Sequence, residues 1–383
     1  MDRDPRNFWS PSSSGEVPRI SPLNTLQDGE RCLPLGDLLP GIRNELTLKE
    51  ISTKLSWKDF HVLSSVSRGW RHAIRSREVY NERARWQTRE TVALILYGSH
   101  PDPYQLALYC MRDGSSYLVP PIPGFEGGIP SCSRCVSVDG RLFVIGGLRD
   151  LSNPHKGEVY VLDLAGQIGW KLCASMREFE ADLKSGVLHG KIYVFGMFVG
   201  ESNVCGEVYD QKTNTWSSIW TPIRGYVDYQ VESLGEEIFL FGVPWDVDPG
   251  FWAYHPVKEE WREVDLEHRE DLLPFMAQGK WHVMCSHDIF VHDSKKNSWI
   301  ELPTFAFAEN FNPDFVEGPL CVQAVKEELL ALWDFTVEEN DARLFRSKGF
   351  CGDAKKILWE KAPLDFAADC IKSYGCSLST VEL

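Results

Sequence analysis

The sequence lacks the long apolar runs and targeting features of membrane and secreted proteins. No apolar run approaches the ~18 residues of a membrane-spanning helix. The N-terminal stretch MDRDPRNFWSPSSSGEVPRI is polar and rich in Pro and Ser, so we expect no secretory signal. No Asn-x-Ser/Thr glycosylation site occurs. We therefore expect a cytoplasmic or nuclear chain with no membrane partner.

The sequence also lacks the cysteine and histidine patterns of disulfide-linked, metal-binding and catalytic proteins. Its 11 cysteines are scattered and odd in number, which favours a reducing compartment. The pair Cys132 and Cys135 has C-x-x-C spacing, but Cys370 and Cys376 are too far apart to complete a zinc site. No zinc-protease, nucleophile-elbow or P-loop motif is present. We predict no metal, no cofactor and no catalytic residue.

The charge is unevenly distributed along the chain. The net charge is −15, made up of +3 in residues 1–90 and −18 in residues 91–383. Such an acidic body disfavours nucleic-acid binding, which requires neutralisation of phosphates. It would suit a basic protein partner, although an acidic surface also serves solubility alone.

Three regions are distinguished by composition and periodicity. Residues 1–35 are rich in Pro, Ser, Gly and Asp and are predicted to form a disordered arm. Residues 36–88 carry helical periodicity, with Ser56 as a predicted N-cap between two helices. The apolar positions of the first helix, predicted to share one face, are Leu46, Ile51 and Leu55. Those of the second are Phe60, Leu63, Val66 or Ser67, Trp70 and Ile74.

Residues 89–383 read as short strands arranged in a repeat. An Asp or His closes one strand, and a Trp follows after five residues, or six in the first copy. The tryptophans of these copies are Trp170, Trp216, Trp261 and Trp299, spaced 46, 45 and 38 residues apart. Upstream of each such turn lies an apolar run, the first being DGRLFVIGG with Gly146 and Gly147. An apolar strand without alternation is typical of a blade packed on both faces.

These units predict an all-β propeller. Six units of just under 50 residues, each worth about four strands, fill the region. The first unit lacks an opening strand. We predict that residues 372–382 supply it and close the ring, which would remove two exposed sheet edges.

The residues assembled above resemble two known families. DG-LFVIGG, then VYVLD, then Trp170 resembles a kelch repeat, whose family fold is a β-propeller. LLPGI, NELTLKEISTKL and DFHVLSSVSRGWRHAI resemble an F-box over residues 38–85. The combination is most similar to plant F-box/kelch proteins. The resemblance implies a small all-α F-box module followed by an all-β kelch-type propeller of six blades.

The F-box resemblance implies a Skp-type adaptor and, through it, a cullin as partners. The chain would then be the non-catalytic, substrate-recognition subunit of a Skp–cullin–F-box ubiquitin ligase. The residues that match the motif and are expected to bind the adaptor are Leu39, Pro40, Ile42, Leu46, Ile51, Leu63, Val66 and Trp70. Pro40 and Trp70 are the preferred contacts, whereas Leu55 and Ile74 could be internal core.

The kelch resemblance implies that loops at one end of the propeller hold a target protein. By position these loops carry Arg149, Asp150, Phe198, Glu201, Trp245, Asp246, Asp334 and Phe335. Trp245 lies in a loop of Pro, Asp and Gly with little core to join, and Trp is enriched at binding hot spots. The alternative is a kelch interaction scaffold without ligase function, in which the helices are a structural cap.

Overall fold

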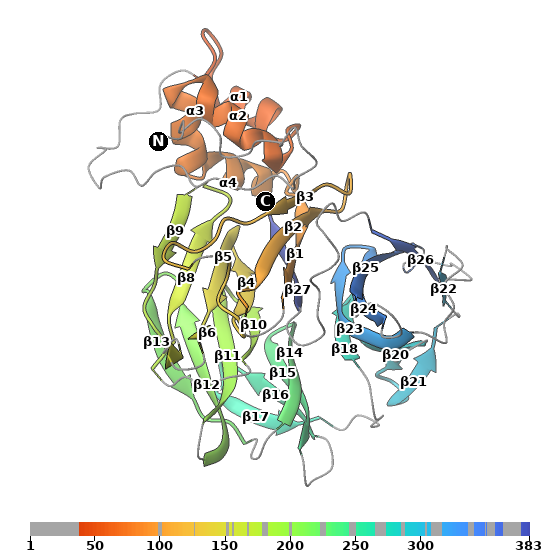
Figure 1. Ribbon diagram of the computed structural model, residues 1–383. Helices are drawn as coiled ribbons and strands as arrows, with labels where there is room; N and C mark the ends of the chain where they lie inside the picture. Colours follow the sequence, from red (N-terminus) through yellow and green to blue (C-terminus); the bar gives the residue numbers. More distant parts are fainter. Residues whose placement is uncertain are drawn as a thin grey trace.

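The computed structural model has a small helical module that precedes a six-bladed β-propeller, so the predicted fold class is confirmed (Figure 1). The predicted arm, residues 1–35, lies outside the described residues. The structure describes residues 38–98, 102–125, 127–150, 153–154, 157–166, 168–177, 183–198, 201–222, 227–244, 250–264, 273–284, 288–302, 305–307, 316–335, 341–348, 350, 357–362 and 377–383.

The described helical module consists of four short α-helices, one π-helical turn and one 3₁₀ turn. Its elements are α1 (Asn44–Thr47), a π-helical turn (Leu48–Ser52), a 3₁₀ turn (Trp57–Asp59), α2 (Phe60–Val66), α3 (Arg68–Arg75) and α4 (Glu78–Arg85). As predicted, Ser56 is the residue before a helical start, and its N–H donates to the Asp59 carboxylate at 3.1 Å. No helix within the described ranges is long and apolar enough to cross a membrane.

Two expectations for the helices are wrong. The second predicted helix is divided at Ser67, which is extended (φ −155°, ψ 165°) and whose hydroxyl accepts from the Trp70 N–H at 3.1 Å. The π-helical turn after α1 changes the phase of the first helix. As a result Leu46 is exposed while Ile51 packs against the core, so these two residues do not share a face.

Each blade is an antiparallel sheet whose first strand lies at the propeller axis. Blade 1 is β27 (Ser377–Glu382), β1 (Thr91–Tyr97), β2 (Gln105–Cys110) and β3 (Ser116–Leu118). Blade 2 is β4 (Arg134–Val138), β5 (Arg141–Ile145), β8 (Val159–Asp163) and β9 (Ile168–Leu172), with a ribbon of β6 (Leu148–Asp150) and β7 (Asn153–Pro154). Blade 3 is β10 (Lys184–Leu188), β11 (Lys191–Phe198), β12 (Glu201–Asp210) and β13 (Thr215–Ile219).

The remaining blades follow the same order. Blade 4 is β14 (Val227–Leu234), β15 (Glu237–Pro244), β16 (Gly250–His255) and β17 (Glu260–Glu263). Blade 5 is β18 (Leu273–Ala277), β19 (Lys280–Met284), β20 (Ile289–Asp293) and β21 (Ser298–Glu301). Blade 6 is β23 (Val316–Val325), β24 (Glu328–Phe335), β25 (Asp341–Lys348) and β26 (Ile357–Lys361), with β22 (Phe305–Phe307) parallel to β26.

The repeated tryptophan begins the outer strand and joins neighbouring blades. The indole N–H of Trp216 donates to the Ala174 carbonyl at 2.7 Å, and that of Trp170 donates to the Pro120 carbonyl at 2.9 Å. The aspartate that precedes the turn shapes it, since the Asp210 carboxylate accepts from the Lys212 N–H at 2.9 Å. The tryptophan repeat therefore encodes both the outer hairpin and the contact between blades.

The glycine pair after β5 has a packing role. Gly146 and Gly147 have φ values of +64° and +102°, a region that other residues rarely adopt. A Cβ on Gly147 would lie 2.7 Å from Pro130 Cβ, so a side chain cannot be accommodated there. Leu142 to Ile145, directly before the pair, are all buried between neighbouring blades.

The ring is closed by the C-terminal strand. β27 pairs with β1 in an antiparallel register from Thr91↔Glu382 to Leu96↔Ser377. The closing strand was predicted over residues 372–382, of which 372–376 lie outside the described residues. Backbone hydrogen bonds of Leu383 with Glu90 extend the pairing beyond the strand.

Deletion of residues 377–383 is expected to destabilise the propeller as a whole. It removes the buried side chains of Leu378, Val381 and Leu383 and exposes an edge of β1, at a cost of about 5 kcal/mol from lost burial alone. Urea unfolding followed by tryptophan fluorescence measures the loss. Glu382→Ala, an exposed position on the same strand, should change stability by less than ~0.5 kcal/mol. Unchanged unfolding of the truncated chain would contradict ring closure by this strand.

Candidate functional site

The helical module shares one hydrophobic core with the first two blades. Trp57, Phe60, Trp70 and Ile74 of the module belong to the same buried cluster as residues of β1, β2, β5 and β8. The Trp57 ring meets Tyr117 of blade 1 edge-on, with centroids 5.6 Å apart. The module is therefore packed on the propeller as part of its fold.

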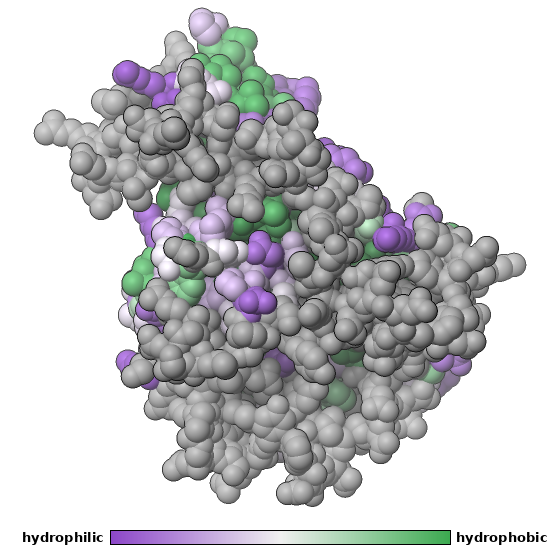
Figure 2. Space-filling view, in the orientation of Figure 1, coloured by the Kyte–Doolittle hydropathy of each residue, from purple (hydrophilic) through white to green (hydrophobic). Residues whose placement is uncertain are grey.

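Other apolar residues of the module face outward and form an apolar patch. The patch consists of Ile42, Leu46, Val62 and Val66, which are 47%, 46%, 51% and 65% exposed. Figure 2 shows hydrophobic surface gathered over the helical module. Four large aliphatic side chains left exposed on so small a module indicate a surface that binds another protein.

The structure separates the predicted adaptor-binding residues into three groups. Ile42, Leu46 and Val66 lie in the apolar patch, and Pro40 is exposed. Leu39, Ile51 and Leu63 are half-buried, the last two against the shared core. Trp70 is 1% exposed and packs inside the module. The indole of Trp70 is therefore a core group of the module, and its part in adaptor binding stays a prediction.

Val62 is a patch residue that the sequence analysis missed. It precedes Val66 by one helical turn on α2, so the two side chains project from the same face. The available signal was the i, i+4 spacing of Val62 from Val66, which was itself a predicted contact.

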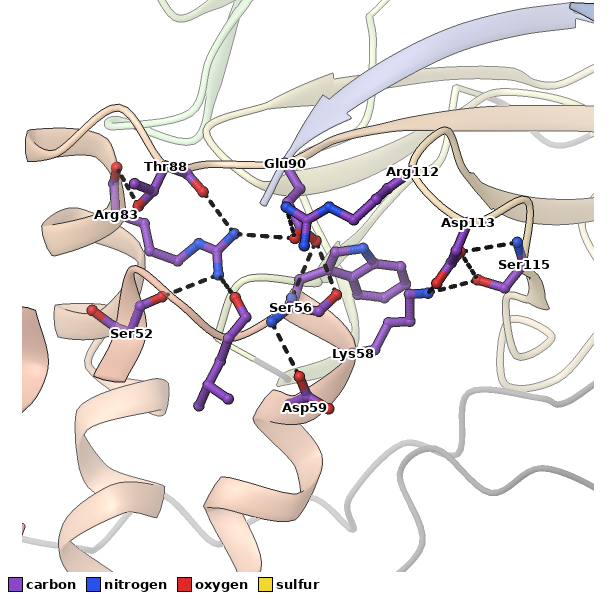
Figure 3. A network of polar contacts seen from close by, with 12 residues as sticks. Ser52, Ser56, Lys58, Asp59, Arg83, Thr88, Glu90, Arg112, Asp113 and Ser115 are labelled. Atoms are coloured by element: carbon purple, nitrogen blue, oxygen red, sulfur yellow. Dashed lines mark hydrogen bonds and ion pairs between the residues drawn. The ribbon is translucent and has the colours of Figure 1, made fainter. Parts of the chain in front are cut away.

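A buried polar network fixes the module to the propeller (Figure 3). The Glu90 carboxylate is nearly inaccessible and accepts from Ser56 Oγ at 3.0 Å and from the Trp57 N–H at 3.4 Å. It also lies 2.7 Å from the guanidinium of Arg112 and 3.9 Å from that of Arg83. Since Ser56 and Arg83 belong to the module and Arg112 to blade 1, one carboxylate joins both parts of the chain.

Arg83 extends this network into the module. Its guanidinium donates to the carbonyls of Ser52, Leu55 and Thr88, so it holds the end of the π-helical turn against α4. Burial lowers the pKa of Arg83 from its ordinary value, and Glu90 opposes that shift. The guanidinium therefore depends on Glu90 for its charge compensation.

Two further contacts attach the module at separate points. Lys58 pairs with Asp113 and donates to Ser115 of the β2–β3 turn. Burial would raise the pKa of the Asp113 carboxyl, but hydrogen bonds from Lys58 and Ser115 outweigh it and hold that pKa well below its usual range. On blade 2, Arg77 pairs with Asp163 at 3.3 Å. Because the module is attached to both blade 1 and blade 2, it cannot rotate about a single point of attachment.

The predicted target-binding positions lie at the end of the propeller away from the module. The module contacts the β4–β5 turn, where Arg77 donates to the Asp139 carbonyl. In blades 2 to 6 a turn of this kind joins the first strand to the second. The second strand therefore runs away from the module and ends near the predicted loops. The backbones of Arg149, Asp150, Phe198, Glu201, Asp334 and Phe335 lie in strands that reach this far end. Trp245 and Asp246 lie outside the described residues.

The described residues offer little for catalysis. No group of three or more His, Cys, Asp or Glu side chains that could hold a metal ion occurs among them. Cys135 of the C-x-x-C pair is buried and reduced, and burial raises the pKa of its thiol to about 12. A thiol with so high a pKa is not a nucleophile at neutral pH.

A comparison with known proteins shows that the chain is similar to F-box/kelch-repeat proteins of Arabidopsis thaliana. The chain is 28% identical to F-box/kelch-repeat protein At4g39560 of Arabidopsis thaliana, over 57% of this chain and 81% of that protein. It is 26% identical to At4g39580 over 78% of this chain and 80% of the relative, and 27% identical to At4g39590 over 78% and 77%. No family model matches the chain. The resemblance predicted from the sequence is confirmed by these relatives.

Glu90→Gln is expected to destabilise the chain by about 3 kcal/mol, because it leaves the buried Arg83 guanidinium without a counter-charge. Glu82→Gln is the matched control, since its partner Arg85 is largely exposed and the pair should contribute less than ~1 kcal/mol. Chemical unfolding of both variants measures the difference. Equal stability of the two variants would show that the Glu90 network does not hold the module.

Proposed function

We propose that this chain, similar to F-box/kelch proteins, is the substrate-recognition subunit of a Skp–cullin–F-box ubiquitin ligase. The helical module binds a Skp-type adaptor, and through it a cullin, while the propeller holds a target protein. The observation that carries the proposal is the exposure of Ile42, Leu46, Val62 and Val66 on a module whose largest core side chains, Trp57, Phe60 and Trp70, are buried.

The patch has the composition expected of a protein interface. Its side chains lie on α1, α2 and the turn before α1, and each is at least 46% exposed. Exposed apolar residues on helices suit a hydrophobic groove on a partner. Burial of each aliphatic side chain would contribute roughly 1.5–3 kcal/mol.

The alternative of a non-ligase scaffold, with the helices as a structural cap, leaves the patch without a role. Capping is performed by the buried set, Trp57, Phe60, Trp70 and Ile74, which packs on blades 1 and 2. The outward-facing residues contribute nothing to that contact. This division of apolar residues favours the adaptor-binding function over the cap alone.

The chain needs no bond chemistry for this role. Its contribution is proximity, because a target held by a body fixed to the ligase has a high effective concentration near the transfer enzyme. The polar contacts of Glu90, Lys58 and Arg77 keep the module fixed on the propeller. We also propose a cytoplasmic or nuclear site of action, consistent with the thiols of Cys110, Cys135 and Cys173, which form no disulfide.

Val66→Asp is expected to weaken binding to a Skp-type adaptor at least ~tenfold, because it places a charge in a desolvated contact. Val257→Asp is the matched control, since Val257 is 76% exposed in the β16–β17 turn of the propeller. A pull-down with purified adaptor, quantified by titration, compares the two. Equal binding of both variants would remove the patch from the interface.

A double variant, Leu39→Ala with Pro40→Ala, tests the edge of the same surface. It should strongly reduce adaptor binding while thermal unfolding of the propeller stays unchanged. If the wild-type chain binds no Skp-type adaptor, the ligase function is wrong, whatever the variants do.

A further inference from the structure

The six first strands of the blades enclose a central cavity of ≈ 300 Å³. Each of these six strands contributes to its wall, with Arg134, Lys184, Gln230, Leu273, Cys321 and Ser377 among the lining residues. The starts of β4 and β10 lie opposite the β4–β5 and β10–β11 turns, and hence at the end of the propeller away from the helical module. Arg134 and Lys184, which begin these two strands, therefore lie toward the far end of the cavity.

Two ionisable groups of opposite charge lie in this wall without touching. Arg134 on β4 and Glu232 on β14 both line the cavity, and β10 lies between their strands. On β10 the intervening wall includes Gly186, which has no side chain to fill the space. Within the described part of the chain, neither Arg134 nor Glu232 makes a hydrogen bond or an ion pair, although each feels the charge of the other.

Burial raises the pKa of the Glu232 carboxyl to about 7, and Arg134 acts in the opposite direction. Lys184 of β10 is a second cation in the wall, and the thiols of Cys135 and Cys321 are its other titratable groups. β18 and β27 add no titratable residue to the described lining. The wall thus combines two basic side chains with a carboxyl whose pKa is raised toward neutrality.

We propose that this cavity binds a small hydroxylated organic anion, with its acid group against Arg134 and a second oxygen that accepts a hydrogen bond from the neutral Glu232 carboxyl. A guanidinium and a neutral carboxyl are complementary to a carboxylate. Gln230, Gln323 and Thr380 also line the cavity and can bond to hydroxyl groups. The site is separate from the apolar patch and does not depend on the adaptor.

The pH dependence has a definite sign. An anion in the cavity favours the protonated form of Glu232, so binding raises its pKa above the unbound value of about 7. By linkage, the affinity is highest below pH 7 and falls as the pH rises through it. A zwitterion with its ammonium group at Glu232 would show the opposite trend.

The test is isothermal titration calorimetry of the full chain with tartrate, a hydroxylated dicarboxylate whose charge is the same at pH 6 and pH 8. We expect saturable binding that is about tenfold weaker at pH 8, since a group with a pKa near 7 loses about nine-tenths of its protonated form over this range. Arg134→Gln should weaken binding about tenfold or more at both pH values. Glu232→Gln, which donates at every pH, should abolish the pH dependence and keep the affinity.

Arg262→Gln is the matched control, because Arg262 is an exposed arginine of blade 4 outside the cavity, and it should bind tartrate as the wild type does. The proposal is overturned if tartrate gives no saturable binding at either pH, or if Arg134→Gln binds it like the wild type. Free glutamine is the zwitterionic probe. The proposal is also overturned if glutamine binds in place of tartrate, with an affinity that rises with pH. Should Arg134→Gln fail to fold, the comparison of Glu232→Gln with the wild type at the two pH values decides alone.

Discussion

The pairing of Glu90 is the interaction on which the rest of the structure depends. Its backbone bonds to Leu383, where the chain ends, and so continues the β1–β27 pairing that closes the ring. Its carboxylate accepts from Ser56 and Trp57, where the helical module meets blade 1. Because this carboxylate is buried, a module that moved would remove its contacts with Ser56, Trp57 and Arg83 and leave it only Arg112 of blade 1. The same residue, Glu90, therefore takes part both in closing the ring and in holding the helical module in place.

The propeller could be predicted because its repeat is encoded locally. A turn-forming aspartate or histidine, a short polar insert and a tryptophan recur in four of the six units. In the copy with Asp210 and Trp216, these residues act on neighbours in sequence or on the adjacent blade. Asp210 shapes its own turn, and Trp216 bonds to the blade before it. The repetition then predicts the propeller, because a sheet that is apolar on both faces must be covered on each side by another sheet.

The module was predicted less completely because its decisive contacts are distant in sequence. Ser56 and Glu90 are 34 positions apart, and Arg77 and Asp163 are 86 apart. Nothing in helical periodicity marks these pairs. The break at Ser67 likewise follows from its own hydroxyl, which caps α3 and competes with continuation of the helix. The far-end loops are harder still, because residues that select a target follow no structural period.

The apolar residues of the module show why a pattern alone could not locate the site. Trp70 and Val66 occupy positions with the same helical spacing, yet one is core and the other is patch. Periodicity identifies apolar residues, whereas the partner of each face is decided by which blade lies against it. Trp57, Phe60 and Trp70 are buried in the core shared with blades 1 and 2. The residues of the apolar patch stay exposed, because no other part of the described chain covers them. That exposed remainder is the basis of the proposed interface with a second protein.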